Sequence, residues 1–100
     1  MESIGIVFRG CKPSGLLLAA ARESLRDVES RVGAIDRGRI LLGPRDPFRV
    51  TLDLAYRHYR VFVVREALDA QTAIARAFQA AEQQMLEIKR RQDEGERLTA

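Results

Sequence analysis

The stretch DAQTAIARAFQAAEQQMLEIKRR, residues 69–91, decides the fold of this chain of 100 residues. Its apolar side chains recur every three or four residues, which is the spacing of one face of an α-helix; they are Ile74, Ala77, Phe78, Ala81, Met85 and Ile88. Asp69 can cap the start of this helix, and the basic residues 89–91 suit the negative end of its dipole. A helix this long with one apolar side needs a surface to pack on, so we expect the rest of the chain to supply it.

Four other segments have the pattern of β-strands. Apolar side chains alternate with other residues over 4–8 and 50–56, and shorter apolar runs cover 39–42 and 59–64. In the last run the inward face stays open, because Val61 and Val63 compete with Phe62 and Val64. Residues 57 and 58 are expected at a hairpin tip, and without an Asn-Gly pair their turn type is unassigned.

A second helix is predicted between the first two strands. Ser14 can cap its start and Gly33 can end it. The apolar positions between them have helical spacing, at Leu17, Ala21, Leu25, Val28 and Val32. Pro44 and Pro47 lie so close together that residues 43–47 are expected to form a loop.

The predicted order is β-α-β-β-β-α, an α+β fold in a single domain of residues 1–94 with a flexible tail at 95–100. A strand–helix–strand start favours a parallel first pair, and a hairpin adds antiparallel strands. Both helices should therefore pack on one face of a mixed four-stranded sheet. The expected core between them is Ile6, Phe8, Leu25, Val28, Leu52, Leu54, Ile74, Phe78, Ala81 and Met85.

The composition limits the class of protein. Hydrophobic residues make up 46% and charged residues 31%, as in soluble globular domains. The longest apolar run, Leu16–Ala21, is too short to span a bilayer, and Met1-Glu2 does not begin a signal peptide. The single cysteine, Cys11, fits a reducing compartment, so we expect a cytoplasmic protein.

No residue pattern predicts catalysis, a metal site, a cofactor or a small-molecule substrate. The loop Gly10–Gly15 follows a strand but lacks the order of a phosphate-binding loop, and Pro13 removes a backbone donor. His58 has no second histidine and no nearby cysteine for a zinc set. Tyr56 and Tyr59 could stack on bases, although packing is the commoner use.

The net charge of +3 comes from 17 basic and 14 acidic side chains. Most of the bases are arginine, whose planar guanidinium suits phosphate recognition but also ordinary solvated surface. Charge alone therefore leaves both uses open.

The sequence resembles the short ribosome hibernation-promoting factors, a family also called protein Y, ribosome-associated inhibitor or sigma 54 modulation protein. The resemblance runs from about Ile4 to Lys89 and aligns without a gap over Phe48–Ile74. The matching residues are Phe8-Arg9-Gly10, Leu25, Val28, Phe62, Glu66, Asp69 and Ala73-Ile74. The family's long form carries a C-terminal dimerisation domain to which no part of these 100 residues corresponds. Whether such a domain exists elsewhere and what the oligomeric state is stay open.

The resemblance implies binding of the small ribosomal subunit, in the channel for tRNA and mRNA, with down-regulation of translation under stress. Phosphates of ribosomal RNA would meet basic residues on the two helices. This chain has other residues at several basic family positions: Ser24, Asp27, Ala80, Gln83 and Leu86-Glu87. The remaining candidates for RNA binding are Arg22, Arg26, Arg31, Arg76, Lys89, Arg90 and Arg91. The lost bases favour an alternative, a protein–protein interaction module of the same fold.

Overall fold

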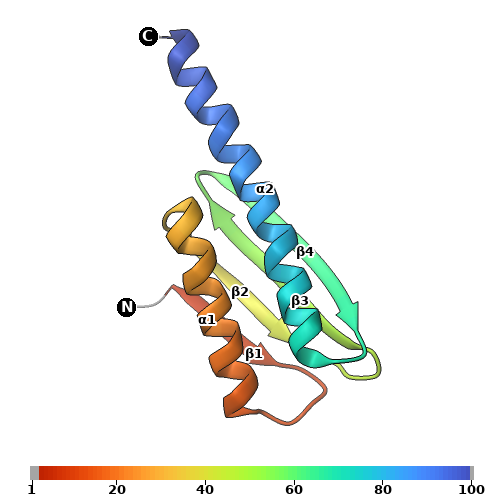
Figure 1. Cartoon of the computed structure of the whole chain (residues 1–100). Helices are drawn as coiled ribbons and strands as arrows, with labels where there is room; N and C mark the ends of the chain where they lie inside the picture. The colour runs from red at the N-terminus through yellow and green to blue at the C-terminus, as the bar shows by residue number, and fades with distance from the viewer. Residues whose placement is uncertain (1–2, 100) are drawn as a thin grey trace.

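A computed structural model describes the backbone of residues 3–99 and the side chains up to residue 95. Its elements follow the predicted order (Figure 1). They are β1 (Ile4–Phe8), α1 (Gly15–Val32), β2 (Arg37–Leu42), β3 (Phe48–Tyr56), β4 (Tyr59–Ala67) and α2 (Ala70–Thr99). The α+β class predicted from the sequence is confirmed.

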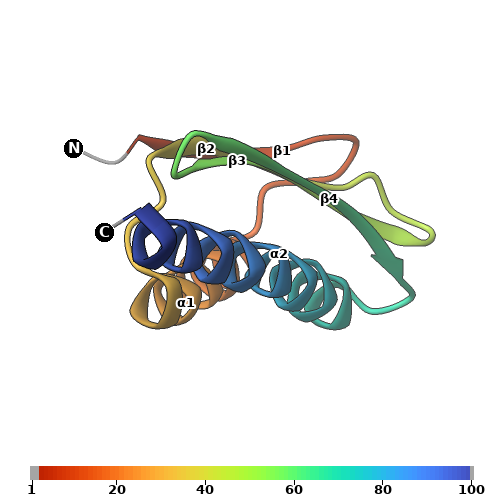
Figure 2. The same ribbon diagram turned by 90° about the horizontal axis from the view of Figure 1, so that it is seen from above.

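The four strands form one mixed sheet in the order β1-β2-β3-β4. β1 and β2 are parallel, while β2–β3 and β3–β4 are antiparallel. Both helices lie on the same side of this sheet, as Figure 2 shows from above. The other side of the sheet, which we call the open face, is not covered by either helix.

The helix starts predicted from the sequence are confirmed. The Ser14 hydroxyl accepts a hydrogen bond from the backbone N–H of Leu17 at 3.3 Å. The Asp69 carboxylate accepts from the N–H of Thr72 at 3.0 Å and from its hydroxyl at 2.8 Å. Both caps satisfy donors that the first turn of a helix leaves unpaired.

β2, β3 and β4 are longer than the sequence predicted because strand pairing recruits their flanking residues, whereas β1 has the predicted bounds. β3 begins at Phe48 and β4 continues to Ala67, and these two residues are partners in the ladder. Residues 57 and 58 form the hairpin tip with φ values of 49° and 72°. Positive φ at both positions is typical of a type I′ turn, here made without Asn-Gly. The open question about β4 is also settled, because Val61 and Val63 are buried.

Seven of the ten predicted core residues are buried; the exceptions are Ile6, Phe8 and Leu25, which are half-buried. The reason is that β1 is an edge strand that α1 does not cover fully. A groove of about 230 Å³ remains between them, lined by Ile6 and Leu25 among others. The core also includes buried side chains that the prediction omitted, among them Val32, Ile40, Leu42, Val50 and Tyr56.

The end of α2 corrects the sequence-based prediction. The helix continues to Thr99, so Lys89, Arg90 and Arg91 lie inside it rather than in its last turn. A helix of 30 residues is about 45 Å long, whereas a strand of nine residues spans only about 30 Å. The C-terminal part of α2 therefore extends past the sheet (Figure 1). The flexibility of residues 95–100 stays a prediction, and the side chains beyond residue 95 lie outside the described part.

The β3–β4 hairpin tip ties the two helices to the sheet. Tyr56 is buried, and its hydroxyl donates to the carbonyl of Val32 at the end of α1. Burial raises the pKa of Tyr56, because the charged phenolate would lose hydration. The carbonyl of Arg57 accepts from the side-chain amide of Gln92 at 3.0 Å. Tyr56 is thus a packing residue, and the hairpin tip contacts the second half of α2 at Gln92.

At the opposite end of the sheet, two loops meet closely. The Cys11 thiol donates to the carbonyl of Leu42 at 3.4 Å. A Cβ atom on Gly43, whose φ is 110°, would lie 2.1 Å from the carbonyl oxygen of Arg9.

No helix in the described part of the chain is both long and apolar enough to cross a membrane.

Candidate nucleic-acid interface

The charges of the chain are divided unevenly between helices and strands. α1 contains three arginines and three acids, and α2 contains five bases and five acids, so the helices have no net charge. The strands contain five arginines, at positions 37, 39, 49, 60 and 65, against Asp53 and Glu66. The excess of three positive charges in the strands equals the net charge of the whole chain.

The structure separates the seven predicted RNA-binding residues into groups. Arg22 and Arg26 line the groove between α1 and β1. Arg31 lies between the two helices, and Arg76 is exposed near the start of α2. Lys89, Arg90 and Arg91 lie together in the second half of α2, just before Gln92, whose side chain contacts the hairpin tip.

The groove between the helices is not positive. It has a volume of about 230 Å³ and is lined by Ser24, Asp27, Val28, Arg31, Ala75, Phe78, Gln79 and Glu82. The Nη2 atom of Arg31 lies 2.6 Å from Oε1 of Glu82. This hydrogen-bonded pair raises the pKa of Arg31. Two carboxylates therefore face one guanidinium in the groove that the resemblance assigned to RNA phosphates.

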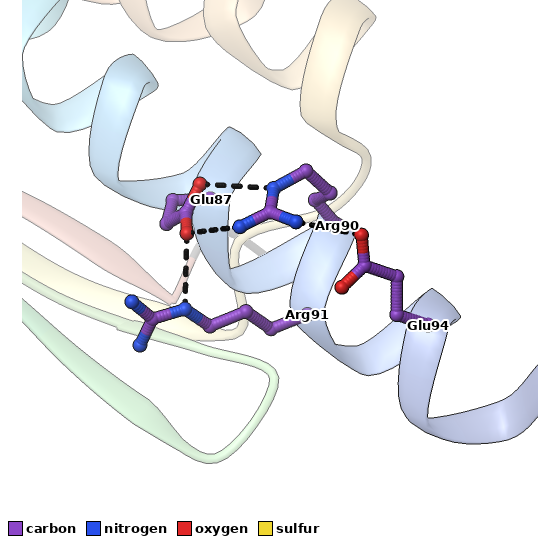
Figure 3. A network of polar contacts seen from close by, with 4 residues as sticks. All are labelled: Glu87, Arg90, Arg91 and Glu94. Atoms are coloured by element: carbon purple, nitrogen blue, oxygen red, sulfur yellow. Dashed lines mark hydrogen bonds and ion pairs between the residues drawn. The ribbon is translucent and has the colours of Figure 1, made fainter. Parts of the chain in front are cut away.

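A network of ion pairs occupies the basic cluster in the second half of α2 (Figure 3). Glu87 accepts from Nε of Arg90 at 3.1 Å and from Nε of Arg91 at 3.0 Å. Glu94 accepts from Nη1 of Arg90 at 2.6 Å. Hydrogen bonding to Arg90 is the main reason that the pKa of Glu87 is lowered, and the same pairing raises the pKa of Arg90. The pairs are exposed, so phosphate oxygens can replace the carboxylates at small cost.

Four of the positions at which the resemblance leads us to expect basic residues lie in two places. Ser24 and Asp27 line the groove between the helices. Ala80 and Gln83 line a depression of about 450 Å³ beside β4, together with Arg65. Arg65 is a base that the sequence analysis did not single out, because the predicted strand stopped at Val64.

The arginines of the open face were not predicted as a site from the sequence. Arg37, Arg39, Arg49 and Arg60 alternate with residues buried on the other side of the sheet. Arg60 forms a two-point pair with Asp53, at 2.9 and 3.1 Å, and Arg49 lies 3.0 Å from Glu66. Arg37 and Arg39 are two residues apart, a spacing that places both side chains on one face of a strand, but the predicted strand began at residue 39.

Within residues 3–95, no group of three His, Cys, Asp or Glu side chains could hold a metal ion.

Comparison with solved structures shows where this fold occurs. The N-terminal domain of Thermus thermophilus Protein Y matches with a TM-score of 0.76 at 18% sequence identity, over 88% of this chain and 99% of that domain. A ribosomal subunit interface protein from Coxiella burnetii matches with a TM-score of 0.77 at 15% identity, over 86% and 96% of the two chains. The resemblance recognised in the sequence is confirmed at the level of the fold. No protein-family model matches the sequence, and no curated protein does.

Proposed function

We propose that this protein binds the small ribosomal subunit through ribosomal RNA, without catalysing a reaction, and lowers translation under stress. The observation that supports this proposal is the extent of the shared fold. Nearly all of the Protein Y domain, 99% of it, superimposes on 88% of this chain. Recognition of structured RNA depends largely on shape, so a shared fold supports the proposal although the surface residues differ.

The bases on the helices differ in how readily they can contact phosphate. Among the side chains described up to residue 95, the structure shows ion pairs for Arg31, Arg90 and Arg91. It shows none for Arg22, Arg26, Arg76 and Lys89, which can meet phosphate directly. The paired arginines must first release a carboxylate, so RNA binding by this chain should be weaker, and its salt slope shallower, than its number of bases indicates.

Sedimentation with ribosomes tests the proposal. The purified protein is mixed with ribosomal subunits and separated on a sucrose gradient at low and at moderate salt. We expect it to migrate with the small subunit at low salt and to dissociate as salt rises. Protein that stays at the top of the low-salt gradient would falsify ribosome binding.

Two opposed variants test the helix bases. Lys89→Gln, Arg90→Gln and Arg91→Gln together remove three charges outside the buried face of α2, so the fold should survive while binding weakens. The log-log salt slope should flatten by up to roughly 0.7–0.9 per lost phosphate contact. The pair Glu87→Gln and Glu94→Gln frees Arg90 and Arg91 and should strengthen binding. If neither variant changes the affinity, this cluster does not contact RNA.

One observation favours the second candidate, a protein–protein interaction module. The groove between the helices contains one guanidinium and two carboxylates, so its net charge repels a phosphate backbone. A partner protein bound there should remain attached after nuclease treatment and at salt that releases RNA. Loss of the partner on nuclease treatment would exclude this candidate.

A further inference from the structure

The open face of the sheet is a surface that the proposed ribosome contacts do not use. Its outward residues form rows across neighbouring strands, as the register of the sheet shows. One row is Arg37–Ala55–Arg60, the next is Arg39–Asp53–Phe62, and a third is Leu41–Thr51–Val64. Both helices lie on the opposite side, so these side chains face away from the core (Figure 2).

A depression of about 770 Å³ lies at the hairpin end of this face. It is lined by Ala55 together with Arg37, Arg39, Arg60, Asp53 and His58, among others. Ala55 lies between Arg37 and Arg60 in the ladder, and its methyl group leaves room that a larger residue would fill. The backbones of the two arginines are two strand spacings apart, about 10 Å, and their side chains form opposite walls.

The charge of this depression is positive. The Nε and Nη2 atoms of Arg60 donate hydrogen bonds to the carboxylate of Asp53, so this ion pair has no net charge. Hydrogen bonding to Arg60 lowers the pKa of Asp53, which keeps the pair ionised at neutral pH. Arg37 and Arg39 are exposed and form no ion pair with any side chain described up to residue 95. They lie two residues apart on one strand, about 7 Å, and point to the same side.

An exposed aromatic ring lies next to Arg60, across Asp53 from Arg39. Phe62 is 49% exposed, and the guanidinium of Arg60 lies 4.8 Å from the centre of its ring. Tyr59 is 54% exposed and lines the depression with His58 at the hairpin tip. Arginine and aromatic side chains together offer planar surfaces on which unpaired bases can stack, while free arginines hold the backbone.

We propose that the open face binds single-stranded RNA, with phosphates on Arg37 and Arg39 and a base in the depression over Ala55. A second copy of the chain is disfavoured, because it would bring together two surfaces that each have an excess of arginine. A duplex does not fit either, since its bases are paired and cannot enter the depression or stack on Phe62. This proposal does not depend on ribosome binding, because it concerns the opposite side of the molecule.

The test uses fluorescence anisotropy with a labelled, unstructured RNA of twelve nucleotides as the probe. Arg37→Gln with Arg39→Gln removes two charges from the open face, and we expect at least tenfold weaker binding. Ala55→Leu fills the depression without changing the charge, and we expect a similar loss. The matched control is Lys12→Gln with Arg45→Gln, which removes two charges from loops at the other end of the sheet and should change affinity less than twofold. Circular dichroism confirms that each variant is folded.

The outcomes are distinct from those of the ribosome experiment. Binding of the RNA that is lost in both open-face variants but kept in the control supports the proposal, whether or not the protein migrates with ribosomes. Equal losses in the control and the arginine variant would show unspecific charge attraction and overturn it. Unchanged affinity of Ala55→Leu, absence of binding by the wild-type chain, or equal competition by poly-glutamate would also overturn it.

Discussion

The two halves of α2 share one helix but are held in different ways. In the first half, Ala70–Met85, six side chains are buried against the sheet and α1: Ala73, Ile74, Ala77, Phe78, Ala81 and Met85. In the second half, from Leu86 onward, Ile88 and Gln92 are only half-buried, and no side chain described there is fully buried. Packing therefore stabilises the first half, while local ion pairs and the hairpin tip hold the second. The first half of the helix therefore contributes most of the packing, and the second half carries the network of charged side chains.

The largest expected difference between the halves is in packing. Truncating Phe78 to Ala removes a buried ring from the first half and should lower the free energy of unfolding by about 3–5 kcal/mol. Leu86→Ala, the matched change in the second half, should cost less than about 1 kcal/mol, because Leu86 is 42% exposed. Urea denaturation measures both values. Equal losses would mean that the second half also packs against the core.

A smaller effect is expected at the contact between Gln92 and the hairpin tip. Gln92→Ala removes the hydrogen bond to the carbonyl of Arg57 and should cost about 1 kcal/mol. Amide hydrogen exchange should quicken after Leu86 and stay slow before Met85. Gln84→Ala, an exposed position on the same helix, is the control. Equal exchange rates in the two variants would show that the hairpin tip does not hold the helix.

The smallest effect is expected in the ion-pair network. Because Arg90 lowers the pKa of Glu87 in the folded state, the stabilisation is complete above the ordinary carboxyl pKa and is lost as pH falls through the lowered value. The carboxyl of Glu87, followed by NMR, should titrate below its ordinary value of 4.5. In Arg90→Gln its midpoint should move upward, with little change in the unfolding midpoint. If the titration midpoint of Glu87 does not move in this variant, the ion pair between Glu87 and Arg90 in Figure 3 is not formed in solution.

The sequence was sufficient for the features that depend on local patterns. Helical spacing located both helices, and the caps Ser14 and Asp69 located their starts, because each cap acts on donors within three residues. The sequence could not decide which side of β4 faces inward. Both sides are apolar, and only the ladder with β3 places Val61 and Val63 opposite Leu54 and Leu52. The half-buried state of Ile6, Phe8 and Leu25 likewise depends on how far α1 lies from an edge strand.

The candidate site was harder to predict than the fold. The basic residues on the helices could be named from the sequence, but their partners could not. Arg31 pairs with Glu82 across 51 positions of the chain, and such a contact has no local signal. Arg37 and Arg39 were missed because β2 begins with Arg-Gly-Arg, which has no apolar alternation. Their grouping depends on the register that brings Arg37, Ala55 and Arg60 side by side.

The close approach of Gly43 to the backbone of Arg9 limits which substitutions this position can accept during evolution. Any side chain at Gly43 would collide with the Arg9 carbonyl and would also require an unfavourable φ of 110°. A Cβ atom on Gly5 would meet no atom within 4 Å, so a larger residue at this position would not clash. Distant descendants of this sequence can therefore exchange nearly all of their surface charges and still retain a glycine at the end of β2. Because a steric clash constrains Gly43 and no such clash constrains the exposed arginines, we expect this glycine to vary less than they do among related chains.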